Sequence, residues 1–236
     1  MLNREKHQLT MGNILRDIYG DSEIAPLLGF RGGTCAYFFY DLPRFSVDLD
    51  FDLLETDEKT QKLVFVKIKS IVEKYGRVKD SYIKHFTIFC LLSYGLTDQN
   101  IKVEINTRKP MPNLRKYFEL RKYLGISMLV AKQDYMFGSK LAALTSRKET
   151  AMRDIYDVWY FGKNNWDFDV EVVLARTDKD IKTYLADCIV AVEAVKDNEI
   201  LHGLGELVGG KEKVFIKNKL RQEVVFLLKN YQSVLK

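Results

Sequence analysis

The stretch from Leu27 to Leu53 constrains the fold of this chain more than any other part of the sequence. Gly32 and Gly33 make a turn, the next seven residues form an apolar run typical of a short helix, and residues 45–53 alternate between apolar and polar types. Because alternate residues of a strand share a face, the alternation predicts a strand with one buried and one polar face. The apolar members are Phe45, Val47, Leu49 and Phe51, and the polar members are Ser46, Asp48, Asp50 and Asp52.

The polar face of this predicted strand indicates a cation site. Neighbouring carboxylates repel one another, and a divalent cation such as Mg²⁺, which binds oxygen ligands and substrate phosphates, removes the repulsion. The preceding glycines fit the same chemistry, since they let backbone N–H groups approach a phosphate at the positive end of the following helix. Two simpler interpretations stay open: Gly-Gly alone is commonly just a turn, and an Asp-rich strand end is commonly a solvated edge.

The order Gly-Gly-Thr, short helix, Ser-x-Asp-x-Asp resembles the signature of the DNA polymerase β superfamily of nucleotidyltransferases. More narrowly, GFRGGT followed by RFSVDLDF resembles the AbiEii/AbiGii family of nucleotidyltransferase toxins. The resemblance implies an α+β fold, with a small mixed β-sheet and flanking helices followed by a helical C-terminal domain. It also implies transfer of a nucleotide from a nucleoside triphosphate with Mg²⁺ or Mn²⁺, by the toxin of a toxin–antitoxin or phage-defence system with a cognate antitoxin.

The resemblance also assigns roles to the matching residues. Asp48 and Asp50 bind metal, Gly32, Gly33 and Ser46 contact phosphate, and Thr34 caps the following helix. Asp52 departs from a strict two-carboxylate pattern and is interpreted as a supporting or surface residue. Superfamily members commonly carry a third carboxylate on a strand beside Asp-x-Asp, and Glu104, in the alternating run over 101–106, matches that position. An ordinary solvated strand face explains Glu104 equally well.

A lysine lies on the apolar stripe of the helix predicted over 131–147. Lys140 shares that stripe with Met136 and Leu144, so it faces inward or into a cleft and needs an anion. The sequence Lys-Leu-x-Ala-Leu around Lys140 resembles a downstream motif of the same family. The resemblance implies that Lys140 holds triphosphate charge.

A second helix, predicted over 151–162, carries Asp154 and Asp157 on one face. Its Arg-Asp-x-x-Asp pattern continues the family resemblance, which implies that these carboxylates organise Lys140 or accept a proton. The alternative is an ion pair between Arg153 and Asp157, four residues apart, with Lys140 reaching toward solvent.

Residues 107–128 indicate a basic connecting region with interleaved aromatic side chains. Its members are Arg108, Lys109, Arg115, Lys116, Arg121 and Lys122 with Tyr117, Phe118 and Tyr123. Phosphate contact combined with base stacking needs both types. Together with the tRNA-extending members of the family, this stretch predicts an RNA acceptor, the 3′ end of tRNA. Solvated charges around buried aromatics are the other interpretation. The competing functions are nucleotide transfer to a protein or a small molecule, and nucleotide binding without enzymatic activity.

Composition sets the remaining limits. With 236 residues and 47 % hydrophobic content, the chain can bury a core, and we expect a nucleotidyltransferase domain over 1–125 and a helical domain over 126–236. A net charge of +5 permits a nucleic-acid partner without requiring one. Three scattered cysteines suit a reducing compartment. Without a signal peptide or a long apolar run, we expect a cytoplasmic protein that does not bind membranes.

The periodicity of the chain predicts its other elements. Strands are expected over 23–31, 83–94 and 101–106, with a turn over 95–98 joining the last two. Further helices are expected over 4–19, 57–75, 168–176, 179–196, 199–207 and 213–234.

Overall fold

The structure is a computed structural model that describes residues 3–95, 99–109, 111–146 and 150–235. The chain divides into two compact units. Unit 1 comprises Met1–Asp41 and Phe45–Lys132, and unit 2 comprises Leu42–Arg44 and Gln133–Lys236. The domain boundary predicted after residue 125 falls in the turn of a hairpin within unit 1. Most of the predicted turn over 95–98 lies outside the described residues.

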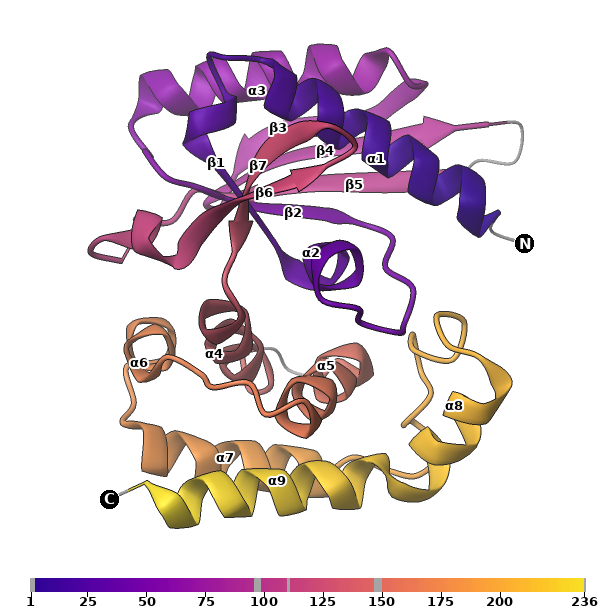
Figure 1. The fold of residues 1–236 in the computed structure, drawn as a ribbon, viewed down its shortest axis with the longest axis vertical. Coiled ribbons are helices and arrows are strands. Elements are labelled where there is room, and N and C mark those ends of the chain that lie inside the picture. The colour runs from indigo at the N-terminus through magenta and orange to yellow at the C-terminus, as the bar shows by residue number, and fades with distance from the viewer. Residues whose placement is uncertain (1–2, 96–98, 110, 147–149, 236) are drawn as a thin grey trace. The chain divides into compact units, whose positions relative to one another are not determined.

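Unit 1 is a seven-stranded mixed sheet with helices on both faces (Figure 1), in the strand order β3-β4-β5-β2-β1-β7-β6. The strands are β1 (Leu28–Arg31), β2 (Leu49–Leu53), β3 (Arg77–Lys84), β4 (Thr87–Tyr94), β5 (Gln99–Asn106), β6 (Phe118–Tyr123) and β7 (Ile126–Ala131). The helices are α1 (Arg4–Gly20), α2 (Gly32–Phe39) and α3 (Glu58–Glu73), with short 3₁₀ turns at Ala25–Leu27 and Leu114–Tyr117.

The apolar face of the sheet forms the core of unit 1. Helices α1 and α3 lie over this face, and α2 lies on the opposite side (Figure 1). Side-chain caps begin both covering helices, since Asn3 accepts from the Lys6 N–H at 2.9 Å and Asp57 accepts from the Thr60 N–H at 3.0 Å. Strands β2 and β5 show why the face is apolar, because every second residue is buried: Leu49, Phe51, Leu53, Ile101, Val103 and Ile105.

The polar face of the sheet follows from the same register. Strand β2 pairs with β1 antiparallel and with β5 parallel, so Asp50 lies opposite Arg31 on one side and Glu104 on the other. Strand β4 continues this row with Phe89 beside Glu104, and β3 continues it with Tyr82 beside Phe89. One transverse row therefore crosses five strands on a single face.

Three sequence predictions in unit 1 need correction. The strand predicted over 45–53 begins only at Leu49, and Ser46 in the segment before it is buried instead of lying on a polar face. The strand predicted over 83–94 is two strands that join at His85 and Phe86, both with positive φ. The region over 107–128, predicted as a connection, contains the β6–β7 hairpin.

Unit 2 is helical. Its elements are α4 (Gln133–Ala143), α5 (Met152–Lys163), α6 (Val170–Thr177), α7 (Ile181–Glu193), α8 (Gly210–Phe215), the π-helical segment η3 (Ile216–Leu220) and α9 (Arg221–Val234). The helix predicted over 213–234 is confirmed as the run α8–η3–α9, which begins at Gly210. The short helix predicted over 199–207 is wrong, because these residues form turns that include Gly203 at φ +64°. Across the described parts of both units, no helix is long and apolar enough to cross a membrane.

Candidate active site

Three carboxylates of unit 1 lie on the polar face of the sheet. Asp48 directly precedes β2, Asp50 lies within it, and Glu104 is the residue of β5 that pairs with Asp50. The predicted position of Glu104 on a strand beside Asp-x-Asp is thus confirmed. Burial, followed by the negative charges of Asp50 and Asp48, raises the pKa of Glu104, while Lys102 opposes the shift. These carboxylates therefore repel one another.

The first residue of α2, Gly32, packs against one of these carboxylates. Gly32 has φ +82°, and a Cβ built on it would lie 2.4 Å from Oδ2 of Asp50. Only glycine fits there, since an L side chain disfavours this φ and would also collide with the carboxylate. The backbone at the start of α2 and the Asp50 side chain consequently lie in direct proximity.

A hydroxyl pair holds the segment that leads into Asp48. The Thr34 hydroxyl lies 2.9 Å from the Ser46 hydroxyl and also bonds the Asp48 carbonyl. Because that carbonyl can only accept, Thr34 is the donor to it. The predicted capping role of Thr34 is wrong, since Arg31 occupies the N-cap position of α2 and Thr34 lies inside the helix. Thr34 instead ties α2 to the backbone of the carboxylate segment.

A histidine that the sequence did not single out holds the same segment from α1. The Nε2 of His7 lies 2.9 Å from the Val47 carbonyl, and its Nδ1 lies 2.5 Å from the Tyr94 hydroxyl. The carbonyl can only accept, so Nε2 carries a proton, and in the neutral ring Nδ1 accepts from the Tyr94 hydroxyl. Burial lowers the pKa of His7, while the Val47 hydrogen bond and the Asp48 charge oppose the shift.

Asp52, on the same strand, is a buried structural residue. Its Oδ1 lies 3.0 Å from Nε of Arg31 and accepts from Nδ2 of Asn106 at 2.8 Å. These contacts join β1, β2 and β5, and the burial of Asp52 excludes the alternative that it is a surface residue. At the other end of β2, Nζ of Lys102 lies 3.8 Å from Oδ2 of Asp48.

The donor set of the polar face fits a divalent cation. Asp48, Asp50 and Glu104 supply carboxylate oxygens, the ligand type that Mg²⁺ and Mn²⁺ prefer. Burial first, and then the charges of Asp50 and Asp48, raise the pKa of Glu104, and a bound cation would relieve the repulsion among the three carboxylates. Within the ranges that the structure describes, no three His, Cys, Asp or Glu side chains are already drawn together as a metal site. The ligand set stays a prediction.

The remaining predicted site residues form a buried ion cluster in unit 2. Nζ of Lys140 lies 2.6 Å from Oδ1 of Asp154 and 2.8 Å from Oδ2 of Asp157, and the lysine side chain is 17 % exposed. Arg44 donates to both oxygens of Asp157, from Nε at 2.5 Å and from Nη2 at 2.7 Å. Arg44 is 2 % exposed and Asp157 is 0 % exposed. Two anions and the Arg44 cation are therefore buried together, with the partly exposed Lys140 as the second cation.

This cluster supplies the anion that the inward-facing lysine needs. The predicted anion is intramolecular, because Asp154 and Asp157 both bind Lys140. Burial alone would raise the pKa of Asp157, but the charges of Arg44 and Lys140 outweigh burial and hold that pKa below its usual range. Oδ2 of Asp154 is buried and has no hydrogen-bond partner among the described residues. Sequence reasoning missed Arg44, to which it gave no role beyond its place in the RFSVDLDF motif.

The basic and aromatic stretch before unit 2 is largely committed to internal contacts. Tyr117 and Phe118 are buried, as the alternative interpretation expected. Arg115 donates to the Pro26 carbonyl at 3.0 Å. Arg121 pairs with Glu119 at 2.7 Å and lies 4.4 Å above the centre of the Tyr40 ring. Lys122 is exposed, and Tyr123 stacks on Phe38 with 4.9 Å between ring centres.

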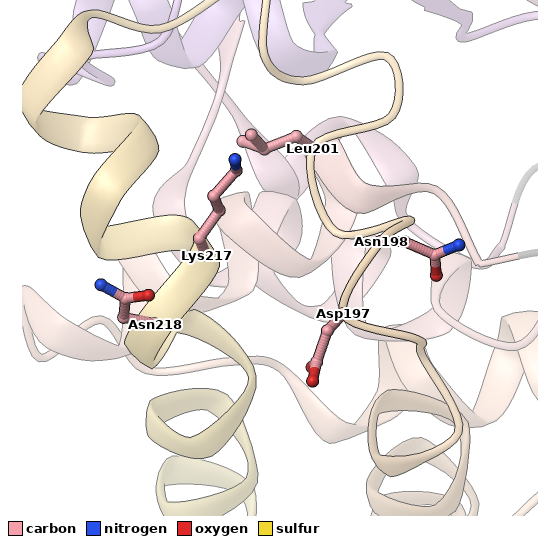
Figure 2. Close-up of a pocket in the computed structure, with 5 residues that line it drawn as sticks. All are labelled: Asp197, Asn198, Leu201, Lys217 and Asn218. Carbon is pink, nitrogen blue, oxygen red and sulfur yellow. The ribbon is translucent and has the colours of Figure 1, made fainter.

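A cavity of about 580 Å³ opens in unit 2 (Figure 2). It lies between the chain after α7 and the π-helical segment η3. Its lining residues are Asp197, Asn198, Leu201, Lys217 and Asn218. This cavity contains no residue that the sequence assigned to the site.

Known proteins share both the sequence pattern and the fold. The family model for the nucleotidyl transferase AbiEii toxin, type IV TA system, matches residues 13–206. A candidate nucleotidyltransferase from Helicobacter pylori has a similar structure, with a TM-score of 0.56 at 20 % identity and 98 % of both chains covered. JHP933 from Helicobacter pylori has a TM-score of 0.52 at 22 % identity, with 99 % of this chain and 96 % of that chain covered. MenT4, a nucleotidyltransferase toxin from Mycobacterium tuberculosis, has a TM-score of 0.62 at 15 % identity, with 99 % of this chain and 85 % of that chain covered. At these identities the likeness shows a shared fold. No curated protein matches the chain.

Proposed function

The chain belongs to the AbiEii family of nucleotidyltransferase toxins of type IV toxin–antitoxin systems. On that basis we propose that it transfers a nucleotide from a nucleoside triphosphate to an RNA acceptor, the 3′ end of a tRNA, in a metal-dependent reaction. The observation that carries the proposal is the polar face of β2 and β5, where Asp48, Asp50 and Glu104 share one face beside the Gly32 turn. A cognate antitoxin would oppose this activity in the cell.

The carboxylates hold the metal in this proposal. A divalent cation bound by Asp48 and Asp50, with Glu104 as a third ligand, would neutralise triphosphate charge and lower the pKa of the acceptor hydroxyl. The carboxylates themselves fix where the phosphate being transferred can lie, since phosphoryl transfer depends mainly on positioning and charge neutralisation. No nucleophilic side chain is required.

The residues around the carboxylates bind the triphosphate. Backbone N–H groups at Gly32 and Gly33 lie at the start of α2, where the helix dipole favours anions. Ser46, which bonds Thr34, is the second proposed phosphate contact. Lys140 is proposed to add positive charge, because an ammonium has three donors and two of them bind Asp154 and Asp157. In the same proposal, Asp154 and Asp157 orient Lys140.

Transfer from labelled nucleotides tests the proposal directly. Purified protein is incubated with each labelled nucleoside triphosphate, Mg²⁺ or Mn²⁺, and total cellular RNA or total protein. Label is expected on tRNA, should depend on the metal, and should be absent with Asp48→Asn. Label on a protein or a small molecule, and none on RNA, would show that this molecule is the acceptor and that the RNA proposal is wrong. A well-folded protein that transfers no nucleotide under any of these conditions would contradict the proposed activity.

A further inference from the structure

The transverse row through the carboxylates ends in an aromatic pair. From Asp50 the row runs to Glu104, then to Phe89 on β4 and Tyr82 on the edge strand β3. The rings of Phe89 and Tyr82 are stacked, with 4.8 Å between centres and 17° between planes. Because side chains in one transverse row share a face, the pair lies on the polar face that carries the carboxylates.

The surroundings of the pair suit a nucleic acid. Phe89 is nearly buried, whereas Tyr82 is partly exposed and presents its ring at the sheet edge. Nζ of Lys84 lies 5.8 Å from the centre of the Tyr82 ring, and Lys102 is exposed on the same face beside Asp48. Single-stranded nucleic acids bind where aromatic rings meet positive charge, because bases stack while phosphates pair with cations.

The aromatic pair and the proposed triphosphate site lie on opposite sides of Asp50. The Gly32 turn, proposed to bind the triphosphate, lies on the β1 side of Asp50, and the aromatic pair lies on the opposite side, beyond β5. With neighbouring strands about 4.8 Å apart, Phe89 and Tyr82 lie roughly 10 and 14 Å from β2 along the row. A strand whose terminal hydroxyl reached Asp50 from this side would place its last bases over the pair.

We propose that Tyr82, supported by Phe89, stacks with a base of the single-stranded 3′ end of the acceptor RNA. This inference rests on the proposed RNA acceptor and adds a binding site for it. Cross-strand aromatic pairs also stabilise sheets, so the test must separate base stacking from a structural role.

A double-mutant cycle without nucleoside triphosphate makes that separation. The affinity of a short labelled single-stranded RNA is compared with that of the same RNA carrying abasic sites at its last three positions. Tyr82→Leu should weaken binding of the intact RNA roughly five- to 150-fold, because base stacking contributes about 1–3 kcal/mol. Binding of the abasic RNA should be unchanged, and Tyr82→Phe should retain wild-type affinity. Phe86→Leu, at a 64 % exposed ring in the same hairpin, is the matched control and should have no effect.

A second variant protects the test against misfolding. Tyr82→Trp keeps an aromatic ring on the strand, and its emission above the wild-type background should be quenched by intact RNA and not by abasic RNA. Equal losses for the two RNAs, no loss with Tyr82→Leu, or no quenching would each contradict the stacking site. Extension of RNA by the wild-type protein is measured in parallel. If the wild type extends RNA but Tyr82→Leu weakens binding of both RNAs equally, only the stacking site is contradicted. If Tyr82→Leu weakens binding of the intact RNA alone but the wild type extends no RNA, only the transfer proposal is contradicted.

Discussion

At the scale of single residues, Gly32 links backbone conformation to the position of a carboxylate. Gly32→Ala should abolish transfer, because its Cβ would collide with Oδ2 of Asp50, and it should lower the free energy of unfolding by about 1–3 kcal/mol through strain at positive φ. Gly125, also at φ +82°, has no other atom within 4 Å of an added Cβ among the described residues. Gly125→Ala should therefore share the loss of stability and keep activity. Equal activity in both variants, measured per folded molecule, would refute the steric role of Gly32.

Asp48 tests the metal assignment. Asp48→Asn should abolish transfer and leave the fold intact, because the amide keeps the size of the side chain and loses its charge. Without metal the variant should be at least as stable as wild type, since Asp48 is one of the charges that raise the pKa of Glu104. Thermal melting with and without Mg²⁺ measures this, and only the wild type should be stabilised by the ion. Asp52→Asn is the contrasting variant and should lose stability through its contacts with Arg31 and Asn106. Full activity of Asp48→Asn would exclude the metal role.

Local sequence identified the carboxylate residues and missed the residues that hold them. Gly32, Asp48 and Asp50 were predictable because each belongs to one short motif whose spacing carries the chemistry. His7 and Arg44 carry no such signal. Their roles come from contacts with Val47, 40 residues away, and with Asp157, 113 residues away. Such pairs form only when distant elements fold together, and no periodicity encodes them.

At the scale of elements, helices α4 and α5 depend on their buried charges. Lys140→Ala should lower the free energy of unfolding by about 3–5 kcal/mol, because it leaves two buried carboxylates with one cation. Adding Asp154→Asn restores the balance of charge and should recover part of that stability. Activity separates the two roles of Lys140. If the lysine contacts triphosphate, the double variant regains stability and keeps a raised KM for nucleotide. A double variant with wild-type KM would show that Lys140 is structural.

The contact between α1 and the segment before Asp48 should make stability depend on pH. The folded state holds the pKa of His7 below 6.5, so the unfolded chain takes up a proton first as the pH falls. The free energy of unfolding should therefore decrease below pH 6.5, and His7 should contribute no pH dependence above it. Denaturant titrations of wild type and His7→Gln measure this, and the variant should have a flatter profile. A wild-type profile in His7→Gln would contradict the assignment.

Hairpins were harder to predict than helices for a physical reason. Helices α1, α3 and α5 carry an apolar stripe that a sequence displays directly. The turn between β3 and β4 has no glycine, although both His85 and Phe86 adopt positive φ, so nothing in the sequence marks a break in the run over 83–94. In β6, the exposed residues are Leu120 and Lys122, while Glu119, Arg121 and Tyr123 are half-buried. This mixture of exposed and half-buried residues does not show the apolar–polar alternation of a strand.

At the scale of the whole molecule, a net charge of +5 is too small to direct RNA by itself, so local charge must do so. Lys116→Gln with Lys122→Gln should make RNA affinity less sensitive to salt. The slope of log K against log salt should become shallower by about 0.7 for each phosphate that the protein no longer neutralises. Lys211→Gln with Lys213→Gln removes the same charge from unit 2 and should change the slope less. Nucleotide KM should be unchanged in both pairs. The same slope change in both pairs would assign the effect to overall charge.

The place of Arg44 in the chain has a consequence for how the protein is made. Arg44 precedes Asp48 by four residues in the sequence, yet it belongs to unit 2, and its buried partner Asp157 is translated 113 residues later. At synthesis rates of roughly 5–20 residues per second, the ribosome needs about 6–23 seconds to deliver that partner. A nascent chain thus carries the Ser46–Asp50 motif complete in sequence, held by Thr34 and His7, before Arg44 has its partner. The Arg44–Asp157 ion pair can form only after α5 has left the ribosome.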